Sequence, residues 1–184
     1  LCSMISPAEY IQLKAFARQD GFFVGLLWVF TFACFVASMR SPELQVGFIS
    51  GMMVSPFIIY FRLRHYRDKV VGHTLSFKRA FAYLFYVIAD ASIVLAAATF
   101  VYFCFIDNGQ FMSYLNQSIA QPEVRQSIAQ AGMSIDEVSR QLQAFSQTRP
   151  IDIAFGIFFN TLLFGLLLAL LLSLLCRRAA TAKQ

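Results

Sequence analysis

Asp90 is the residue of this 184-residue chain that most invites a chemical role, because it is the one charged residue in the run from 80 to 106. A carboxylate inside a long apolar segment costs about 2.5–3.5 kcal/mol on insertion scales, so it should point away from lipid and be protonated or paired. Tyr86 and Tyr83 precede it on the same helical face, and Asn160 should reach a similar depth in the last apolar run. We therefore predict an inward-facing intramembrane polar cluster of Asp90, Tyr86, Asn160 and Tyr83.

Two roles fit such a cluster. Hydrogen bonds between membrane helices commonly serve packing and contribute about 0.6 kcal/mol on average, so Asp90 could lock the third apolar helix to the fourth. An intramembrane carboxylate can also couple to protons or to a substrate. Exchange of Asp90 for Asn separates the two roles, because it keeps the shape and removes the titration.

A metal or acid-base site is suggested by His65, Asp68 and His73, which are potential ligands close together in the sequence. Their spacing matches neither HExxH nor a known zinc pattern. Asp68, between Arg67 and Lys69, is more simply an ion-pair partner. The four cysteines are too far apart for CxxC chemistry. We expect no metal, no cofactor and no catalytic residues, since no phosphate loop, nucleophile motif or cofactor fingerprint occurs.

The composition is that of a membrane protein. Hydrophobic residues make up 58% of the chain and charged residues 14%, against about 25% charged in soluble domains. Apolar runs cover residues 21–39, 44–61, 80–106 and 153–176. The first of them, 21–39, would reach roughly 28 Å as a helix, which matches a hydrocarbon core. We predict an all-α integral membrane four-helix bundle; a cleavable signal peptide is the competing interpretation of the first run.

The remaining segments complete the predicted organisation. Residues 1–20 should form a cytoplasmic interfacial helix before the membrane domain of residues 21–176, and residues 177–184 a basic tail. The polar stretch 107–150 carries apolar residues at helical spacing and should form short amphipathic helices in an extracytoplasmic loop. Those helices either rest on their own bundle or bind a partner protein.

Positive charge predicts the orientation. Eleven Lys and Arg residues fall at the N-terminus, in the segment 62–79 and in the tail, whereas four fall in the two connections on the opposite side. Because cytoplasmic loops carry the excess of Lys and Arg, both termini should be cytoplasmic in a bacterial inner membrane. The net charge of +5 therefore needs no nucleic-acid partner.

Six cations between the second and third apolar runs form a candidate patch for lipid headgroups or an acidic partner: Arg62, Arg64, Arg67, Lys69, Lys78 and Arg79. Anionic headgroups attract basic residues by about 1 kcal/mol each near the surface. Topology determination alone is the simpler explanation of the same charges.

Small residues four positions apart predict close helix packing. They are Gly21 and Gly25 in the first run, Gly47, Gly51 and Ser55 in the second, and Gly165, Ala169 and Ser173 in the last. Since a short connection joins the first two runs, we expect their stripes to face each other within one chain. A homo-oligomer face is the alternative.

The segment YRDKVVGHTLSFKRAF, residues 66–81, carries a family resemblance. With the hairpin before it and the Gly- and Leu-rich last helix, it resembles domain-of-unknown-function family 4199, small inner-membrane proteins of Bacteroidota. His73 departs from the second glycine typical of that family, which affects the shape of the turn. The resemblance implies a four-helix inner-membrane protein without established activity, similar in gene setting to accessory proteins of polyprenyl-phosphate glycosyltransferases.

Together these observations favour a non-enzymatic accessory or scaffold protein that supports envelope glycan or lipid assembly. Its partners would be membrane lipids and a membrane protein such as a polyprenyl-phosphate glycosyltransferase. A small transport subunit that uses Asp90 is the alternative, and an enzyme acting on lipid comes third. A water-filled cavity that reaches Asp90 would favour transport.

Overall fold

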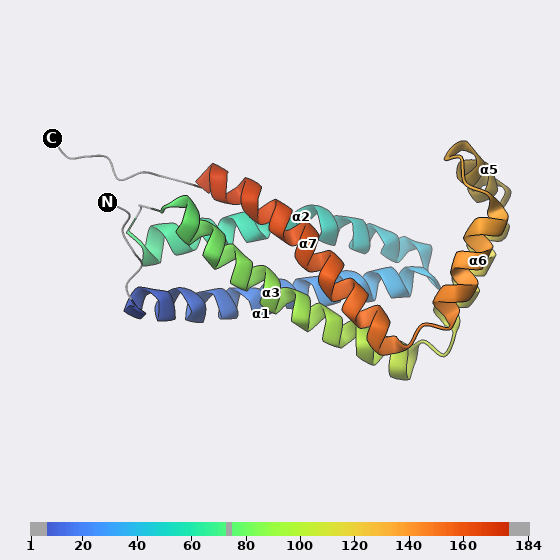
Figure 1. Ribbon diagram of the computed structural model, residues 1–184, viewed down its shortest axis with the longest axis horizontal. Coiled ribbons are helices and arrows are strands. Elements are labelled where there is room, and N and C mark those ends of the chain that lie inside the picture. Colours follow the sequence, from blue (N-terminus) through green and yellow to red (C-terminus); the bar gives the residue numbers. More distant parts are fainter. Residues whose placement is uncertain (1–6, 73–74, 177–184) are drawn as a thin grey trace.

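The computed structural model describes residues 7–72 and 75–176, and throughout this part the chain is organised as helices (Figure 1). Four helical segments are long and apolar enough to cross a membrane: Ala8–Ser38, Pro42–Val70, Phe77–Ile106 and Pro150–Cys176. The predicted all-α fold with four spanning helices is confirmed. The predicted basic tail, 177–184, lies outside the described residues.

The first span is longer than predicted. Helix α1 runs without a break over Pro7–Ser38, 32 residues or about 48 Å. The expected interfacial segment is the first part of this helix, because nothing at Asp20 or Gly21 stops helical hydrogen bonding. Leu13 and Ala17 are fully buried, so this segment packs into the bundle rather than lying flat on a membrane surface.

The other spans also extend beyond their apolar runs. Helix α2 (Gln45–His65) follows a short 3-10 turn, Pro42–Leu44, and continues into one π-helical turn, Tyr66–Val70. Helix α3 (Phe77–Val101) is capped by Ser76, whose Oγ accepts a hydrogen bond from the backbone N–H of Arg79 at 3.4 Å. It ends in a second π-helical turn, Tyr102–Ile106. Helix α7 covers Pro150–Cys176.

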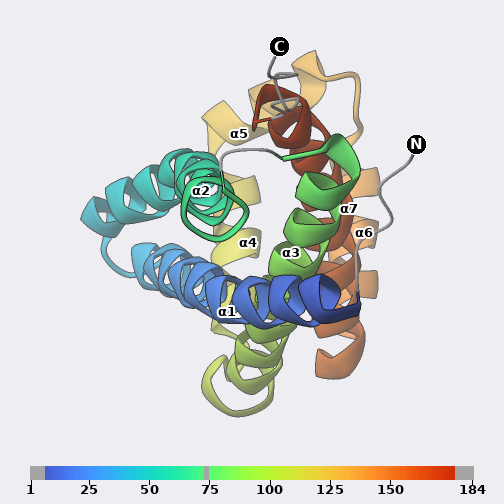
Figure 2. The same cartoon turned by 90° about the vertical axis from the view of Figure 1, so that its left-hand side faces the viewer.

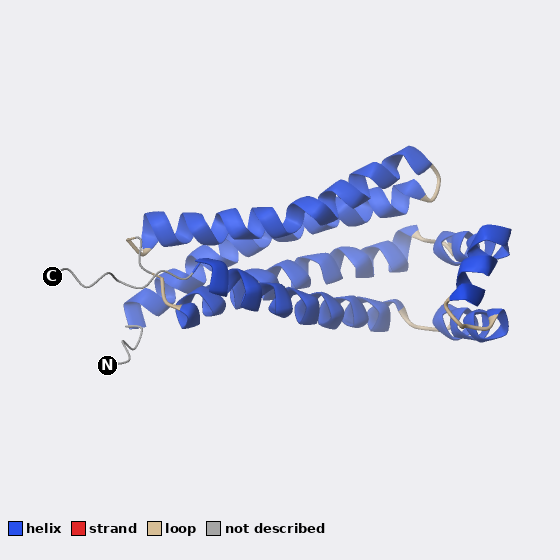
Figure 3. Cartoon of the chain, turned by 90° about the horizontal axis from the view of Figure 1, so that it is seen from above, coloured by secondary structure: helices blue, strands red, loops and turns tan. Residues whose placement is uncertain are grey.

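The four long helices share two ends. The start of α1, the end of α2, the start of α3 and the end of α7 lie together at one end, here called the terminal end (Figure 1). The α1–α2 connection and three short helices, α4 (Gln110–Ala120), α5 (Pro122–Gln130) and α6 (Ile135–Ser146), lie at the other, here called the loop end (Figures 1 and 3). Within the described residues, this arrangement puts the segments of the predicted cytoplasmic side at the same end of the bundle.

The long helices pack in the order α2, α1, α3, α7 rather than in chain order. The most extensive contacts join α1 to α3 and α3 to α7, followed by α1 to α2, and α2 touches α7 only sparsely. Seen along the bundle, α1 and α3 therefore lie between α2 and α7 (Figure 2). From above, the α1–α2 hairpin diverges from α3 and α7 toward the loop end (Figure 3).

This order corrects the predicted role of the first glycine stripe. Gly21 and Gly25 face α3, where a Cβ on Gly25 would stand 2.8 Å from the Cβ of Val94. Close approach to α3 requires both glycines, so the prediction that they face the second helix is wrong. The second stripe does face α1: a Cβ on Gly51 would stand 2.2 Å from Oγ1 of Thr31. Gly165 of α7 receives the side chain of Ile88 from α3 in the same way.

The start of α4 is attached to the loop end of the bundle. Phe111 of α4 contacts the rings of Phe35 on α1, Phe103 and Phe145 of α6, with ring centroids 5.4–6.4 Å apart. Asp107 anchors the start of α4, because its carboxylate accepts hydrogen bonds from Tyr102 Oη and from the backbone N–H groups of Gly109 and Phe111. The short helices otherwise pack mainly on one another, α5 on α4 and α6.

Candidate functional site

A buried carboxylate at the terminal end joins three helices. Asp20 of α1 is only 7% exposed. Its Oδ1 lies 3.1 Å from Nη1 of Arg62 on α2, and its Oδ2 accepts a hydrogen bond from Tyr83 Oη on α3. The Arg62 guanidinium also lies over the ring of Phe23, 5.2 Å from its centroid. A buried charge requires such partners, so Asp20, Arg62 and Tyr83, here called the Asp20 triad, fix α1, α2 and α3 relative to one another.

The Asp20 triad sits at the boundary between the apolar spans and the polar terminal segments. Asp20 directly precedes the first apolar run and Arg62 directly follows the second. Next to the triad, the ring of Tyr66 stacks on the ring of Tyr83, with centroids 4.3 Å apart and planes 11° apart. Both rings are fully buried. The stack therefore adds a buried contact between the end of α2 and α3.

A second layer of polar contacts surrounds the stack. Arg79 Nε donates to Tyr66 Oη at 3.5 Å, and Arg79 Nη1 lies 3.2 Å from Oε1 of Glu9 on α1. Arg67, 5% exposed, donates from Nε to Asp68 Oδ1 at 2.7 Å, and from Nη1 to the carbonyl oxygen of Cys176 at 3.5 Å. This layer ties the start of α1, the α2–α3 connection and the end of α7 together.

The structure divides the predicted basic patch into two groups. Arg62, Arg67 and Arg79 turn inward and make the contacts described above. Arg64, Lys69 and Lys78 are exposed, although Arg64 Nε also lies 3.5 Å from Asp68 Oδ2. Half of the patch therefore has a packing role that sequence reasoning did not foresee, and half remains available to headgroups or an acidic partner.

Asp90 faces α1, not α7. A Cβ on Gly21 would stand 2.9 Å from the Cβ of Asp90, so the carboxylate lies beside the α1 backbone. Its Oδ2 is buried and has no hydrogen-bond partner among the described residues. The oxygens of Ser92 and Ser173 are buried and without a partner in the same described part.

The other members of the predicted intramembrane cluster have separate partners. Tyr83 donates to Asp20, and Tyr86 shares a hydrogen bond with Tyr10 of α1. Asn160 Nδ2 donates to the carbonyl oxygen of Gly156, one turn earlier in its own helix, at 2.9 Å. The structure thus does not bring Asp90, Tyr86, Asn160 and Tyr83 together. The reason is that α3 presents Tyr83, Tyr86 and Asp90 to α1, while α7 packs on a different side of α3.

The metal interpretation of the α2–α3 connection finds little geometry to support it. His65 is exposed, Asp68 is engaged by Arg67, and His73 lies outside the described residues. In residues 7–72 and 75–176, no three His, Cys, Asp or Glu side chains gather as metal ligands would.

An apolar cavity of about 660 Å³ opens between α2 and α7, with α1 and α3 forming its floor. Trp28, Phe35, Met52, Ile59, Asn160, Thr161 and Leu168 are among its lining residues. We call it the α2–α7 cavity. A smaller cavity of about 360 Å³, lined by Phe100 and Phe155 among others, lies between α3 and α7. Asp90 lines neither of these two cavities.

Sequence reasoning overlooked Asp20 and the α2–α7 cavity. Asp20 could have been found, since an acid at the start of one apolar run and a base at the end of the next come to the same end of a hairpin with arms of equal length. The cavity had no such signal, because its lining residues are indistinguishable in type from those that pack or face lipid.

Comparisons with known proteins agree with this architecture. No match was found among curated proteins or among solved structures. The model of one protein family, described as "Protein of unknown function (DUF4199)", matches residues 19–178, which include all four apolar runs and the Asp20 triad. The chain therefore belongs to the DUF4199 family, as the segment 66–81 had indicated.

Proposed function

We propose that this protein is a non-enzymatic accessory protein of the bacterial inner membrane that holds a membrane enzyme of envelope glycan or lipid assembly at its terminal end. In this proposal both termini are cytoplasmic, as the distribution of Lys and Arg predicts. The partner would present an acidic cytoplasmic surface, and a polyprenyl-phosphate glycosyltransferase is one candidate of that kind.

One observation carries the proposal: exposed cations stand on a part of the fold that buried contacts make rigid. Lys69 lies in the π-helical turn after α2 and Lys78 in the first turn of α3, and both are exposed. The segments that carry them are held by the Asp20 triad, the Tyr66–Tyr83 stack and the Arg67–Asp68 pair. A first-turn cation is disfavoured by the helix dipole, so an anionic partner would compensate a cost that Lys78 otherwise bears.

Transport is the second candidate, and the buried, unpartnered Oδ2 of Asp90 is the observation that favours it. Against it, the α2–α7 cavity does not include Asp90 in its lining. A proton or substrate path needs a polar route to its carboxylate. The accessory role therefore accounts for more of the structure.

The experiment is affinity purification of the chain, expressed at its native level and extracted in mild detergent, with and without charge reversal. K69E/K78E should lower the recovery of a co-purifying membrane enzyme of lipid-linked glycan assembly several-fold. The matched control is R125E/R140E, which reverses two exposed cations at the loop end. It should leave recovery unchanged.

Two results would contradict the proposal. Equal recovery of the membrane enzyme with K69E/K78E and with the unchanged chain would show that Lys69 and Lys78 do not take part in partner binding. If the co-purifying proteins were identical to those of an unrelated four-span membrane protein, the chain would have no specific partner under these conditions.

A further inference from the structure

The α2–α7 cavity has the dimensions of a site for one lipid chain. Along α7 its lining extends from Ile157 to Leu168, about 16 Å of helix. That length is close to half of a hydrocarbon core about 30 Å thick, which is the depth of one leaflet. Its volume of about 660 Å³ lies within the range of about 300–1,000 Å³ that is typical of small-molecule sites.

Four polar side chains of its wall, those of Trp28, Thr31, Ser55 and Asn160, already donate hydrogen bonds within the protein. Trp28 Nε1 donates to Ser55 Oγ at 3.1 Å, and Ser55 Oγ donates in turn to the carbonyl oxygen of Gly51 at 2.9 Å. Thr31 Oγ1 donates to the carbonyl oxygen of Leu27, and Asn160 to that of Gly156. With these groups bonded internally, the wall offers a ligand mainly hydrocarbon contact. Apolar cavities of this kind exclude water.

A hydrocarbon chain suits this space, because the lining consists mainly of aliphatic and aromatic side chains over about the depth of one leaflet. The α1–α2 hairpin and α7 diverge toward the loop end (Figure 3), and the lining residues Phe35 and Phe48 mark the end of the cavity on that side.

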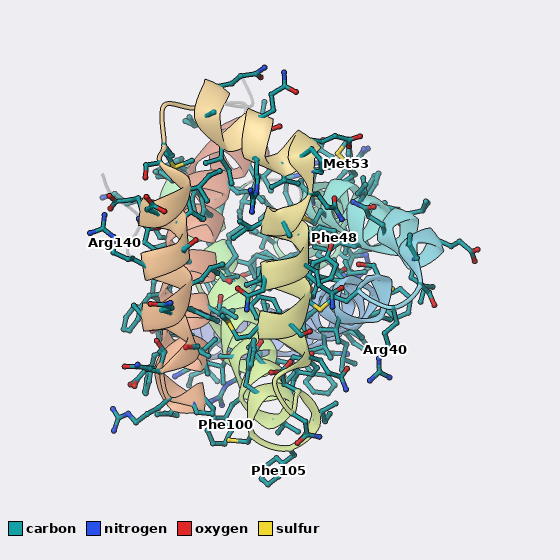
Figure 4. All side chains as sticks on the ribbon, turned by 90° about the vertical axis from the view of Figure 1, so that its right-hand side faces the viewer. Arg40, Phe48, Met53, Phe100, Phe105 and Arg140 are labelled. Carbon is teal, nitrogen blue, oxygen red and sulfur yellow. The ribbon has the colours of Figure 1, made fainter. Side chains whose placement is uncertain are left out.

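A cation lies beside the loop end of the cavity. Arg40 is exposed and lies in the connection after α1, between the lining residues Phe35 of α1 and Phe48 of α2. It donates a hydrogen bond from Nη2 to the neutral side-chain amide of Gln110 on α4. By contrast Arg62, at the other end of α2, is neutralised by Asp20. Figure 4 shows Arg40 pointing outward beside the α1–α2 connection, on the side of the loop end where Phe48 also lies.

We propose that the α2–α7 cavity binds one hydrocarbon chain of a phosphate-bearing lipid from the leaflet at the loop end, with the phosphate beside Arg40. Apolar burial would supply the affinity and the guanidinium the preference for an anionic headgroup. This inference goes beyond the accessory role, because it assigns a ligand to a site remote from Lys69 and Lys78.

The single tryptophan of the chain makes the test direct, since Trp28 lines the cavity. The protein is reconstituted in vesicles that contain phosphatidylglycerol or phosphatidylcholine with brominated chains, and quenching of Trp28 fluorescence is measured against the fraction of brominated lipid. We expect quenching that saturates at a low fraction of brominated phosphatidylglycerol. The preference over phosphatidylcholine should fall about fivefold in R40Q. R140Q, a change at another exposed loop-end arginine, should keep it.

Two pairs of variants test occupancy of the cavity. T161F narrows the cavity from α7 and L163F changes a lipid-facing neighbour, 58% exposed, outside the lining. M52F and M53F form the same pair on α2, where only Met52 lines the cavity. T161F and M52F should reduce saturable quenching by at least half, and L163F and M53F should not. Circular dichroism on each variant restricts the comparison to folded protein.

Three results would overturn the proposal. Quenching that rises only in proportion to the brominated fraction, equally in T161F and L163F, would mean bulk lipid contact alone. Quenching that disappears as the protein-to-lipid ratio rises would show that a second copy of the chain, and not lipid, occupies the cavity. An unchanged lipid preference in R40Q would show that the lipid phosphate does not lie beside Arg40.

Discussion

Gly21 of α1 lies directly against Asp90 of α3, and no side chain fits between the two backbones. A Cβ on Gly21 would stand 2.9 Å from the Cβ of Asp90 and 2.8 Å from the carbonyl oxygen of Val87. Because one of these atoms is backbone, a side chain at position 21 must push α1 and α3 apart. The largest interface of the fold therefore depends on this glycine.

Gly21→Ala should consequently destabilise the protein by about 1–3 kcal/mol, the usual cost of overpacking. The matched control is Gly156→Ala on α7, where a Cβ meets nothing within 4 Å. Thermal unfolding in detergent checks both, with a lower melting temperature expected only for Gly21→Ala. Equal melting temperatures for the two variants would contradict the packing of α1 on α3 at this point.

The Asp20–Arg62 pair should behave as a coupled unit. Arg62→Met leaves the Asp20 carboxylate, 7% exposed, without its cation and should cost about 1–3 kcal/mol, less than for a fully buried pair because the Arg62 side chain is 40% exposed. Adding Asp20→Asn removes the charge that needs compensation, so the double variant should recover part of the loss. Additive losses in this double-mutant cycle would show that the two side chains do not interact.

The sequence predicted the spans well because the signal for them is strong and local. Each apolar run has a length that matches a bilayer and carries no charge apart from Asp90 in the third, and the four spanning helices contain those runs. The ends of the helices were less predictable. Helix α1 begins at Pro7 rather than after Asp20 because tertiary packing of Leu13 and Ala17 extends the span into polar sequence.

The local sequence pattern did not predict which helices pack together or which side chains contact each other. The stripe at Gly21 and Gly25 indicated close packing but not with which helix, and chain proximity suggested the second helix where the structure has the third. Depth alone likewise placed Asn160 near Asp90, although the two side chains lie on helix faces that do not meet. A face is fixed only once the packing angle of α7 on α3 is known.

The topology is tested by single cysteines at Ser127 and Ser76, each in a background without the native cysteines. Ser127 is exposed on α5 at the loop end, and Ser76 is exposed before α3 at the terminal end. The charge distribution predicts that an impermeant thiol reagent labels position 127, and not position 76, in intact spheroplasts. Labelling of position 76 alone would show that the protein has the opposite orientation in the membrane.

The final prediction concerns Asp90→Asn, which separates packing from proton coupling. Because the buried Oδ2 of Asp90 has no partner among the described residues, an uncharged isostere should be as stable as the original or more so. Partner recovery should also be unchanged under the accessory role. Loss of the protein's activity in the cell, with retained stability of the same variant, would instead support transport.

A companion variant asks whether Asp90 communicates with Asn160. Asn160 bonds within its own helix, so the effects of Asp90→Asn and Asn160→Leu on the free energy of unfolding should add within about 0.3–0.5 kcal/mol, as they do for residues without contact. The measurement is a double-mutant cycle by unfolding in detergent, with Asp20→Asn and Tyr83→Phe as a contacting pair that should show coupling. Coupling of 1 kcal/mol or more between Asp90 and Asn160 would restore the polar cluster predicted from the sequence and reopen a path for protons between α3 and α7.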